Sequence, residues 1–414
     1  MRNLGTPPVA VVLTLALTGT WLINAAAPKL EVKQGPRQRI PLAFSHVASP
    51  LHQLGARATQ QLSQEGDDHV NTFWWTNFNG QSLSATLHVN RDDARKSADE
   101  WGIPTEQLDR VARVNEQAIQ SFYDGRNDRD KEIVSHWNVE AELAVNRLNE
   151  RRKAAVDQYN KALKDQLFTD AQVSAAGIEL DESLLTFQHD YDQRIMNLDT
   201  ELARDRHNND AKLEFNLQSN TYRRDQEIRD IYQHACLSLD NQELRINYAR
   251  LIQQDALRLA RASGSLFQAL SGACGTLEAV QDAALAMVTT ALSYQVPPDQ
   301  VNGRDSLGLL PPAACLACGW GDCDSKSLLL ASLMAGWKST SGPSTSCLCV
   351  LIPEHFLIAV RRIPTHGQHY VEFNGESYVL MEPAGPGALP AGEIGESTKQ
   401  YLTAGGEFEL FKMY

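Results

Sequence analysis

No proline occurs between Pro104 and Pro297, and this proline-free stretch limits most strongly what the chain can fold into. Of the 170 residues from 91 to 260, 57 are charged, 24 basic and 33 acidic. Proline breaks helix interiors because it lacks an N–H group and its ring clashes with the preceding turn. A long, highly charged segment without proline therefore predicts long helices.

The apolar residues of this segment recur at helical spacing in narrow, interrupted stripes. Narrow apolar seams between charged faces are typical of an antiparallel helical hairpin or a dimeric coiled coil. We predict a helical or coiled-coil region over residues 104–262, and a homo-oligomer as one outcome of its exposed seams. Breaks are expected at Gly125 and at 175–177, since Gly125 and Gly177 are the only glycines between 103 and 263. The stripes are Trp137, Ala141, Ala144, Leu148, Ala155, Tyr159 and Ala162; Tyr191, Ile195, Leu198 and Leu202; and Leu244, Tyr248, Leu251, Ile252 and Leu259.

The chain begins with an uncharged apolar run. Residues 8–27 are long enough to cross a hydrocarbon core of ~30 Å as a helix. We therefore predict a membrane anchor or a signal peptide over residues 1–27, and the length of the run favours a retained transmembrane helix. Arg2 is the only basic residue before the run, whereas four basic residues follow within 29–39, a bias that argues against export of the body.

Two short regions separate this run from the helical region. Residues 28–69 carry little pattern and are interpreted as a linker. A β-hairpin is predicted in the region 70–103, because polar and apolar residues alternate on both sides of Asn79 and Gly80. Asn-Gly accepts the positive φ values of a tight turn. An isolated hairpin is marginally stable, so we expect it to pack on another part of the chain.

Composition excludes two broad classes of protein. Lys and Arg number 38 against 51 Asp and Glu, a net charge of −13, which argues against nucleic acid as a partner because phosphate binding needs a clustered basic surface. Seven cysteines in 414 residues are too few for a disulfide scaffold.

Residues 271–414 hold 7 basic and 14 acidic residues but ten of the seventeen prolines. We assign residues 263–414 to a compact domain and expect the chemistry there.

The most informative motif surrounds Cys323. Gly-Trp-Gly-Asp-Cys-Asp-Ser-Lys runs from Gly319 to Lys326 and precedes a leucine-rich run. Asp324 and Ser325 are good capping residues, so a helix is expected from Lys326 onward. The unsatisfied N–H groups and positive dipole end of a helix N-terminus lower the pKa of a nearby thiol. Cys323 is therefore the candidate nucleophile.

Two further residues complete a candidate catalytic set. His355 stands at the start of a predicted strand, where its ring can act as a general base. Glu382 ends a later predicted strand, and its carboxylate can orient the imidazole. Asp322 and Asp324 are interpreted as structural, because a carboxylate beside the nucleophile raises the pKa of the thiol.

The order Cys, His, acid on helix, strand and strand resembles the transglutaminase-like cysteine-enzyme superfamily, whose core is papain-like. The resemblance covers residues 285–397 and rests on Gly-Asp-Cys-Asp-Ser-Lys, on the histidine before a Leu-Ile-Ala-Val strand, on Tyr-x-x-Met-Glu-Pro and on a later Gly-Glu-Ile-Gly. It implies a nucleophile at Cys323, a base at His355 and an orienting acid at Glu382. More weakly, the segment 75–80 resembles a Trp-x-x-x-x-Gly hairpin of membrane-attached bacterial members.

Three departures from the family pattern bear on activity. Thr290 stands where the family often has a glutamine that offers an oxyanion donor. Glu382 replaces the commoner aspartate and adds one methylene to the orienting acid. The loop 339–346 between helix and strand is long and rich in serine and threonine.

The sequence therefore predicts an α+β protein with an N-terminal membrane helix, a helical or coiled-coil middle and a C-terminal papain-like transglutaminase core. We expect hydrolysis of a peptide or isopeptide bond in a protein or peptide substrate, through a thioester at Cys323 and without a cofactor. The alternatives are a Gln–Lys cross-linking enzyme and a non-catalytic scaffold that oligomerises through its helices. Bacterial members act at the cell envelope, so the resemblance favours a body outside the cytoplasm, against the charge bias.

Four other cysteines leave several interpretations open. Cys315 and Cys318 form a C-x-x-C pair, and Cys347 and Cys349 lie in a predicted strand. Zinc binding would need all four, or help from His366 or His369, at a spacing that matches no standard site. A disulfide between Cys315 and Cys318 and ordinary buried thiols are the other interpretations, and no metal is expected.

Overall fold

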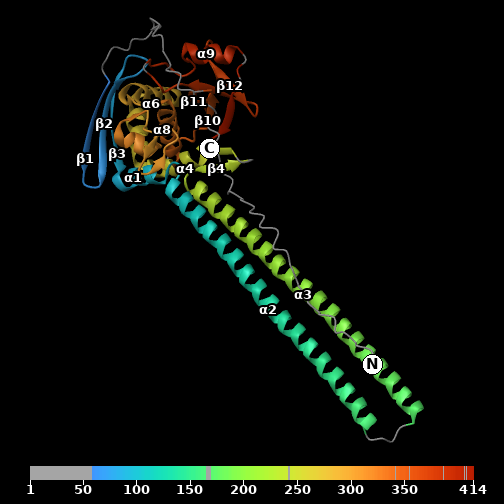
Figure 1. The fold of residues 1–414 in the computed structure, drawn as a ribbon. Helices are drawn as coiled ribbons and strands as arrows, with labels where there is room; N and C mark the ends of the chain where they lie inside the picture. The colour runs from blue at the N-terminus through green and yellow to red at the C-terminus, as the bar shows by residue number, and fades with distance from the viewer. Residues whose placement is uncertain are drawn as a thin grey trace.

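The structure, a computed structural model, describes residues 58–164, 169–240, 243–340, 342–353, 355–385, 387–404, 406 and 408–414. A body of helices and sheets carries two long helices that project from it as a stalk (Figure 1). The α+β class predicted from the sequence is confirmed at the level of mixed helix and sheet.

The stalk is an antiparallel hairpin of α2 (Thr105–Lys164) and α3 (Asp170–His234) within one chain. Near the body, the buried amides of Asn115 and Asn220 are hydrogen-bonded at 2.6 Å. Ion pairs between the two helices show the antiparallel register, because residues farther along α2 meet residues earlier in α3. These pairs are Arg126 with Asp210, Asp130 with Arg206, Glu140 with Arg194 and Arg151 with Asp190.

The helix breaks expected at the glycines are wrong. Gly125 lies inside α2 and Gly177 inside α3, whereas α2 ends at Lys164 and α3 begins at Asp170. Glycine costs a helix only about 1 kcal/mol relative to alanine, which helices of 60 and 65 residues tolerate. A glycine in a long charged helix is therefore a weak signal for a turn.

The helical region predicted over 104–262 is also too long, because the chain re-enters the body after α3. There β4 (Leu237–Asp240) and β5 (Glu243–Ile246) form a hairpin, followed by α4 (Tyr248–Arg258) and α5 (Ala260–Ala273). The last apolar stripe faces the core, where Leu251, Ile252 and Leu259 are buried. Helical periodicity alone does not distinguish a stalk seam from a helix that covers a core.

The first sheet is antiparallel and has the order β1-β2-β3. It comprises β1 (Thr59–Glu65), β2 (Asp68–Thr76) and β3 (Ser82–Asn90), with Gly80 at φ +78° in the β2–β3 turn. The linker predicted over 28–69 is therefore wrong at its end, where β1 adds a third strand to the expected hairpin. Nearly all side chains of β1 are polar and exposed, so it lacks the alternation that identifies a strand. The buried indole of Trp75 donates to Ala283 O at 3.0 Å and ties this sheet to α6 (Leu277–Ala291).

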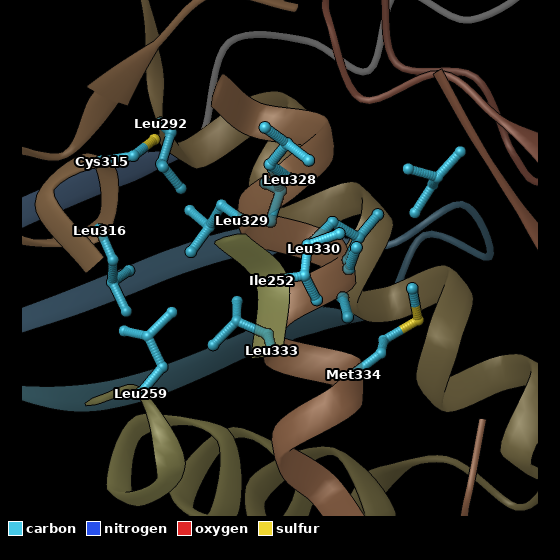
Figure 2. Packing of buried hydrophobic residues seen from close by; sticks show 14 of the residues in the cluster. Ile252, Leu259, Leu292, Cys315, Leu316, Leu328, Leu329, Leu330, Leu333 and Met334 are labelled. Atoms are coloured by element: carbon cyan, nitrogen blue, oxygen red, sulfur yellow. The ribbon is translucent and has the colours of Figure 1, made fainter. Parts of the chain in front are cut away.

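The second sheet is antiparallel, with the order β12-β13-β11-β10-β14. Its central strand β11 packs against α8 (Cys323–Trp337). Leu328, Leu329, Leu330 and Leu333 of α8 are fully buried among residues of α4, α7 and the end of α6 (Figure 2). A helix that is apolar on all sides belongs at the centre of a core. The strands are β10 (Cys347–Ile352), β11 (His355–Arg361), β12 (Tyr370–Phe373), β13 (Glu376–Met381) and β14 (Glu409–Lys412).

Short elements complete the body and connect these layers. They are α1 (Arg91–Glu100), β6 (Ser293–Tyr294), β7 (Gln300–Val301), β8 (Arg304–Asp305), α7 (Pro312–Cys318), β9 (Trp320–Gly321), the 3-10 helix η1 (Lys338–Thr340) and α9 (Glu396–Thr403).

The prediction of a transmembrane helix is corrected by the structure. None of the helices in the described part of the chain combines the length and the apolar character that a membrane span requires. Residues 8–27, on which that prediction rested, lie outside the described residues.

The stalk register predicts a specific cross-link. In a variant with Arg126→Cys and Asp210→Cys, a short bismaleimide should join the two positions within one chain, because their native side chains are in contact. Pairing Arg126→Cys with Asp190→Cys moves one site by 20 residues, about 30 Å along the helix, and should give no such product. Mass spectrometry on mixed light and heavy isotope-labelled chains reads the result. A cross-link between chains would show a dimeric coiled coil instead.

Candidate active site

Cys323 is the first residue of α8, and Asp322 is its N-cap. The Asp322 carboxylate accepts hydrogen bonds from Ser325 N at 3.0 Å and from Ser325 Oγ at 2.6 Å. The helix therefore starts earlier than the expected start at Lys326, because the aspartate before the cysteine provides the cap. The Ser325 hydroxyl also accepts from Leu310 N at 2.9 Å, which fixes the preceding loop against the helix.

The two glycines of the motif allow close approaches. Gly319 ends α7 in the left-handed conformation, at φ +74°. A Cβ at Gly321 would lie 2.8 Å from both Cys315 Sγ and Ser325 Cβ. Glycine at 321 thus lets α7 and the start of α8 pack closely around Cys323.

His355 begins β11, and Glu382 directly follows β13, the neighbouring strand. His355 Nε2 lies 2.7 Å from Glu382 Oε1. Glu382 Oε2 accepts from Gly395 N at 2.7 Å, and Thr398 Oγ1 donates to Oε1 at 3.3 Å. A Cβ at Gly395 would lie 3.3 Å from Glu382 Oε1, so a glycine suits this position. The carboxylate is held at the N-terminus of α9, where N–H groups and the helix dipole favour negative charge.

The backbone of Phe356 connects Cys323 to this His–Glu pair. Ser327, one helical turn after Cys323, donates from Oγ to Phe356 O at 3.2 Å. The backbone amide of Phe356 acts on the Cys323 thiol in the direction that lowers its pKa. Phe356 follows His355, so the structure brings all three predicted residues to one end of α8.

The thiol of Cys323 is not a preformed thiolate, contrary to the expectation from the helix N-terminus. Burial raises the pKa of Cys323 far above its usual range, and the nearby Asp324 and Asp322 carboxylates raise it further. The Cys323 thiol donates to Asp324 Oδ1 at 3.2 Å. A helix N-terminus contributes about 0.3–1 kcal/mol, and here burial and two acidic neighbours outweigh it.

The pKa values of the two buried carboxyl groups move in opposite directions. Burial raises the pKa of Asp322 to about 6, and Asp324 adds to this effect despite the hydrogen bonds from Ser325. Burial also acts to raise the pKa of Glu382, but the hydrogen bond and charge of His355 and the donors Gly395 and Thr398 outweigh it, so this pKa is lowered. Glu382 is therefore an ionised partner for the imidazole at neutral pH.

Lys326 is a buried residue of the site that the sequence analysis missed. Its ammonium donates to Leu292 O at 2.8 Å and to Thr289 O at 3.3 Å, at the C-terminal end of α6. Burial lowers the pKa of Lys326 to about 8. The sequence could have indicated this role, because Lys326 stands at the start of a leucine-rich helix. A lysine buried there needs hydrogen-bond acceptors in the core.

Thr290, the residue at the position of the family's oxyanion donor, already uses its hydroxyl proton in a hydrogen bond within its own helix. The Thr290 hydroxyl donates to Ala286 O at 2.6 Å, within α6. The loop 339–346 begins in η1 and leads to β10.

The remaining cysteines are free thiols. Burial raises the pKa of Cys315 and also that of Cys318. Cys347 and Cys349 are buried in β10, and the phenol of Tyr414 donates to Cys347 Sγ at 2.9 Å. Among the residues that the structure describes, no cluster of three His, Cys, Asp or Glu side chains is placed to hold a metal ion.

Comparison of the chain with protein families, curated proteins and solved structures finds no match.

We predict that Glu382→Gln lowers the free energy of unfolding at about pH 7 by about 1–3 kcal/mol, because His355 and Gly395 lose a charged acceptor. The folded-state pKa of Glu382 is lowered, so its contribution is complete above the ordinary carboxyl pKa. It is lost as pH falls through the folded value. The difference between variant and wild type should therefore shrink near about pH 3. Urea unfolding at both pH values measures it, with the exposed Glu372→Gln as control. An equal deficit at both pH values would contradict the ionised pair.

We also predict that Asp324→Asn speeds alkylation of Cys323 by iodoacetamide. Asp324 is the nearby charge that most raises the pKa of this thiol, so its removal increases the thiolate fraction. The rate should rise roughly three- to tenfold near neutral pH. Peptide mass spectrometry over time measures it, with the exposed Cys318 of the same protein as an internal reference. An unchanged rate would show that burial alone controls the thiol.

Proposed function

We propose that residues 263–414 form a transglutaminase-like cysteine-enzyme domain with a papain-like core. We propose that it hydrolyses a peptide or isopeptide bond through a thioester at Cys323. One observation carries the proposal: the His355–Glu382 pair at 2.7 Å stands next to Phe356, whose carbonyl accepts from Ser327 one turn into the helix that Cys323 begins. A nucleophile, a base and a group that orients the base are the parts that thiol acyl transfer needs.

The bonding of Glu382 supports a definite role for each imidazole nitrogen. Because Glu382 is ionised, it accepts a proton donor, so His355 carries its proton on Nε2. Nδ1 is then the ring nitrogen that can act as the base. This is the tautomer that a cysteine enzyme of this arrangement needs.

The proposed reaction has two stages, acylation of Cys323 and hydrolysis of the thioester. Cys323 gives its proton to His355 Nδ1 while its sulfur bonds to the substrate carbonyl carbon and the carbonyl electron pair moves to oxygen. When that oxyanion collapses, the C–N bond breaks and the imidazolium proton goes to the leaving amine. Water then attacks the thioester, with Nδ1 taking its proton. When the second oxyanion collapses, the C–S bond breaks and the imidazolium gives this proton to sulfur, which restores the thiol.

The raised pKa of Cys323 makes the general base essential. A neutral thiol is a poor nucleophile, so sulfur attack requires proton transfer to His355 in the same step. The activity should therefore depend on His355 more strongly than in enzymes that hold a resting thiolate.

A non-catalytic scaffold is the second candidate, and one observation favours it. The Cys323 thiol is hydrogen-bonded to Asp324, a carboxylate that stabilises the protonated form. In that case the stalk would supply the function and the domain would only bind. The same experiment separates the two candidates.

We predict that His355→Ala slows alkylation of Cys323 by iodoacetamide at least about tenfold, because the thiol loses its base. Cys323→Ser should abolish formation of an acyl-enzyme from p-nitrophenyl acetate, read as an acetyl group on the peptide that contains residue 323. The exposed His366→Ala is the matched control and should change neither rate. If His355→Ala leaves both rates at the wild-type level, the scaffold replaces the enzyme.

A further inference from the structure

Tyr294 is held beside the start of α8 by a short parallel pairing. Strand β6 pairs with β9 so that Tyr294 lies opposite Gly321, two residues before Cys323. The hydrogen bonds are Ser293 N to Gly319 O at 3.1 Å and Gln295 N to Gly321 O at 3.2 Å. The backbone of Tyr294 is thereby fixed to the loop that positions the nucleophile.

The alternation of the strand directs the tyrosine side chain. Successive side chains of a strand point to opposite faces. The Ser293 hydroxyl accepts from Gln60 Nε2 of β1 at 3.4 Å, so Tyr294 points away from that sheet. Among the ionisable neighbours of the phenol, Cys323 has the largest electrostatic effect on its pKa, followed by Asp322 and Asp324.

The phenol is both a stable proton donor and open to a substrate. Burial raises the pKa of Tyr294 to about 12, and the nearby thiol and carboxylates add to the rise, so the hydroxyl keeps its proton at neutral pH. The side chain is nevertheless 51% exposed. A substrate carbonyl approaching Cys323 can therefore also reach the Tyr294 hydroxyl.

A buried contact makes this placement rigid. Lys326 of α8 donates to Leu292 O at 2.8 Å, and Leu292 directly precedes β6. The helix that carries Cys323 therefore holds the strand that carries Tyr294. A hydrogen-bond donor fixed in advance stabilises developing charge without reorganising during the reaction.

We propose that the Tyr294 hydroxyl is the oxyanion donor of this site, in place of the Thr290 hydroxyl, which is bonded to Ala286 O. The inference rests on the proposed acyl-transfer function. As the Cys323 sulfur bonds to the carbonyl carbon, the π electron pair moves to the carbonyl oxygen, and Tyr294 stabilises that oxygen by a hydrogen bond without giving up its proton. When the C–N bond breaks, the oxygen returns to a carbonyl.

Two electrophiles that attack the same thiol test this role. Acylation by p-nitrophenyl acetate passes through a tetrahedral oxyanion, whereas alkylation by iodoacetamide displaces iodide and forms none. In the full chain, Tyr294→Phe should slow acylation of Cys323 by about 100- to 1,000-fold, the range typical of a lost oxyanion donor. Alkylation of Cys323 should stay within about twofold of wild type, which also reports that the site is folded. Thr290→Val is the matched control and should leave both rates unchanged.

The outcomes separate this inference from the proposed function. Equal slowing of both reactions by Tyr294→Phe, or slowing of neither, would overturn the oxyanion role while leaving the thiol enzyme in place. A loss of acylation in Thr290→Val alone would assign the donor to Thr290 and also overturn it. Wild-type protein that is never acylated at Cys323 would overturn the proposed function and this inference with it.

Discussion

The burial of α8 on every side is the constraint on which the rest of the structure depends. Its leucines pack against helices α4 to α7 and against β11, so its position and rotation are fixed by the core. Its first residue is Cys323, and its first turns contact three other elements: Ser325 bonds to Leu310 N, Lys326 to Leu292 O and Ser327 to Phe356 O. These hydrogen bonds fix the positions of the strands that carry His355 and Tyr294 relative to the helix that carries the thiol.

The same burial determines the chemistry that the site can perform. In its fixed position the Cys323 sulfur is desolvated and lies near the Asp322 and Asp324 carboxylates. Both effects raise the pKa of the thiol. Glu382 is also buried, but the donors His355, Gly395 and Thr398 keep it ionised. In the proposed enzyme, a neutral thiol and an ionised acid behind the imidazole would favour a concerted proton transfer over a resting thiolate–imidazolium pair. A site of this kind has little reactivity until an electrophile is bound.

The sequence predicted what depends on local pattern. It predicted the α+β class and the long helices, because proline content and apolar spacing can be read from the local sequence. Of the candidate site residues, His355 and Glu382 lie 2.7 Å apart in the structure. It did not predict β1, whose polar side chains carry no alternation, or the true ends of α2 and α3, since glycine in a long helix is tolerated. Lys326 and Tyr294 depend on contacts between distant segments, and the thiol pKa depends on burial. The transmembrane prediction drew on residues outside the described range and has no counterpart among the described helices.

The proposed mechanism requires Cys323 and His355 to form a working pair, and the distance between Cys323 Sγ and His355 Nδ1 measures this directly. A crystal structure of the full chain, with a second one after alkylation of Cys323, would provide it. A working pair predicts an Sγ–Nδ1 distance within about 4 Å in the free protein, with Nε2 still bonded to Glu382. A sulfur held by Asp324 in both crystals, with the imidazole beyond hydrogen-bond reach, would contradict it.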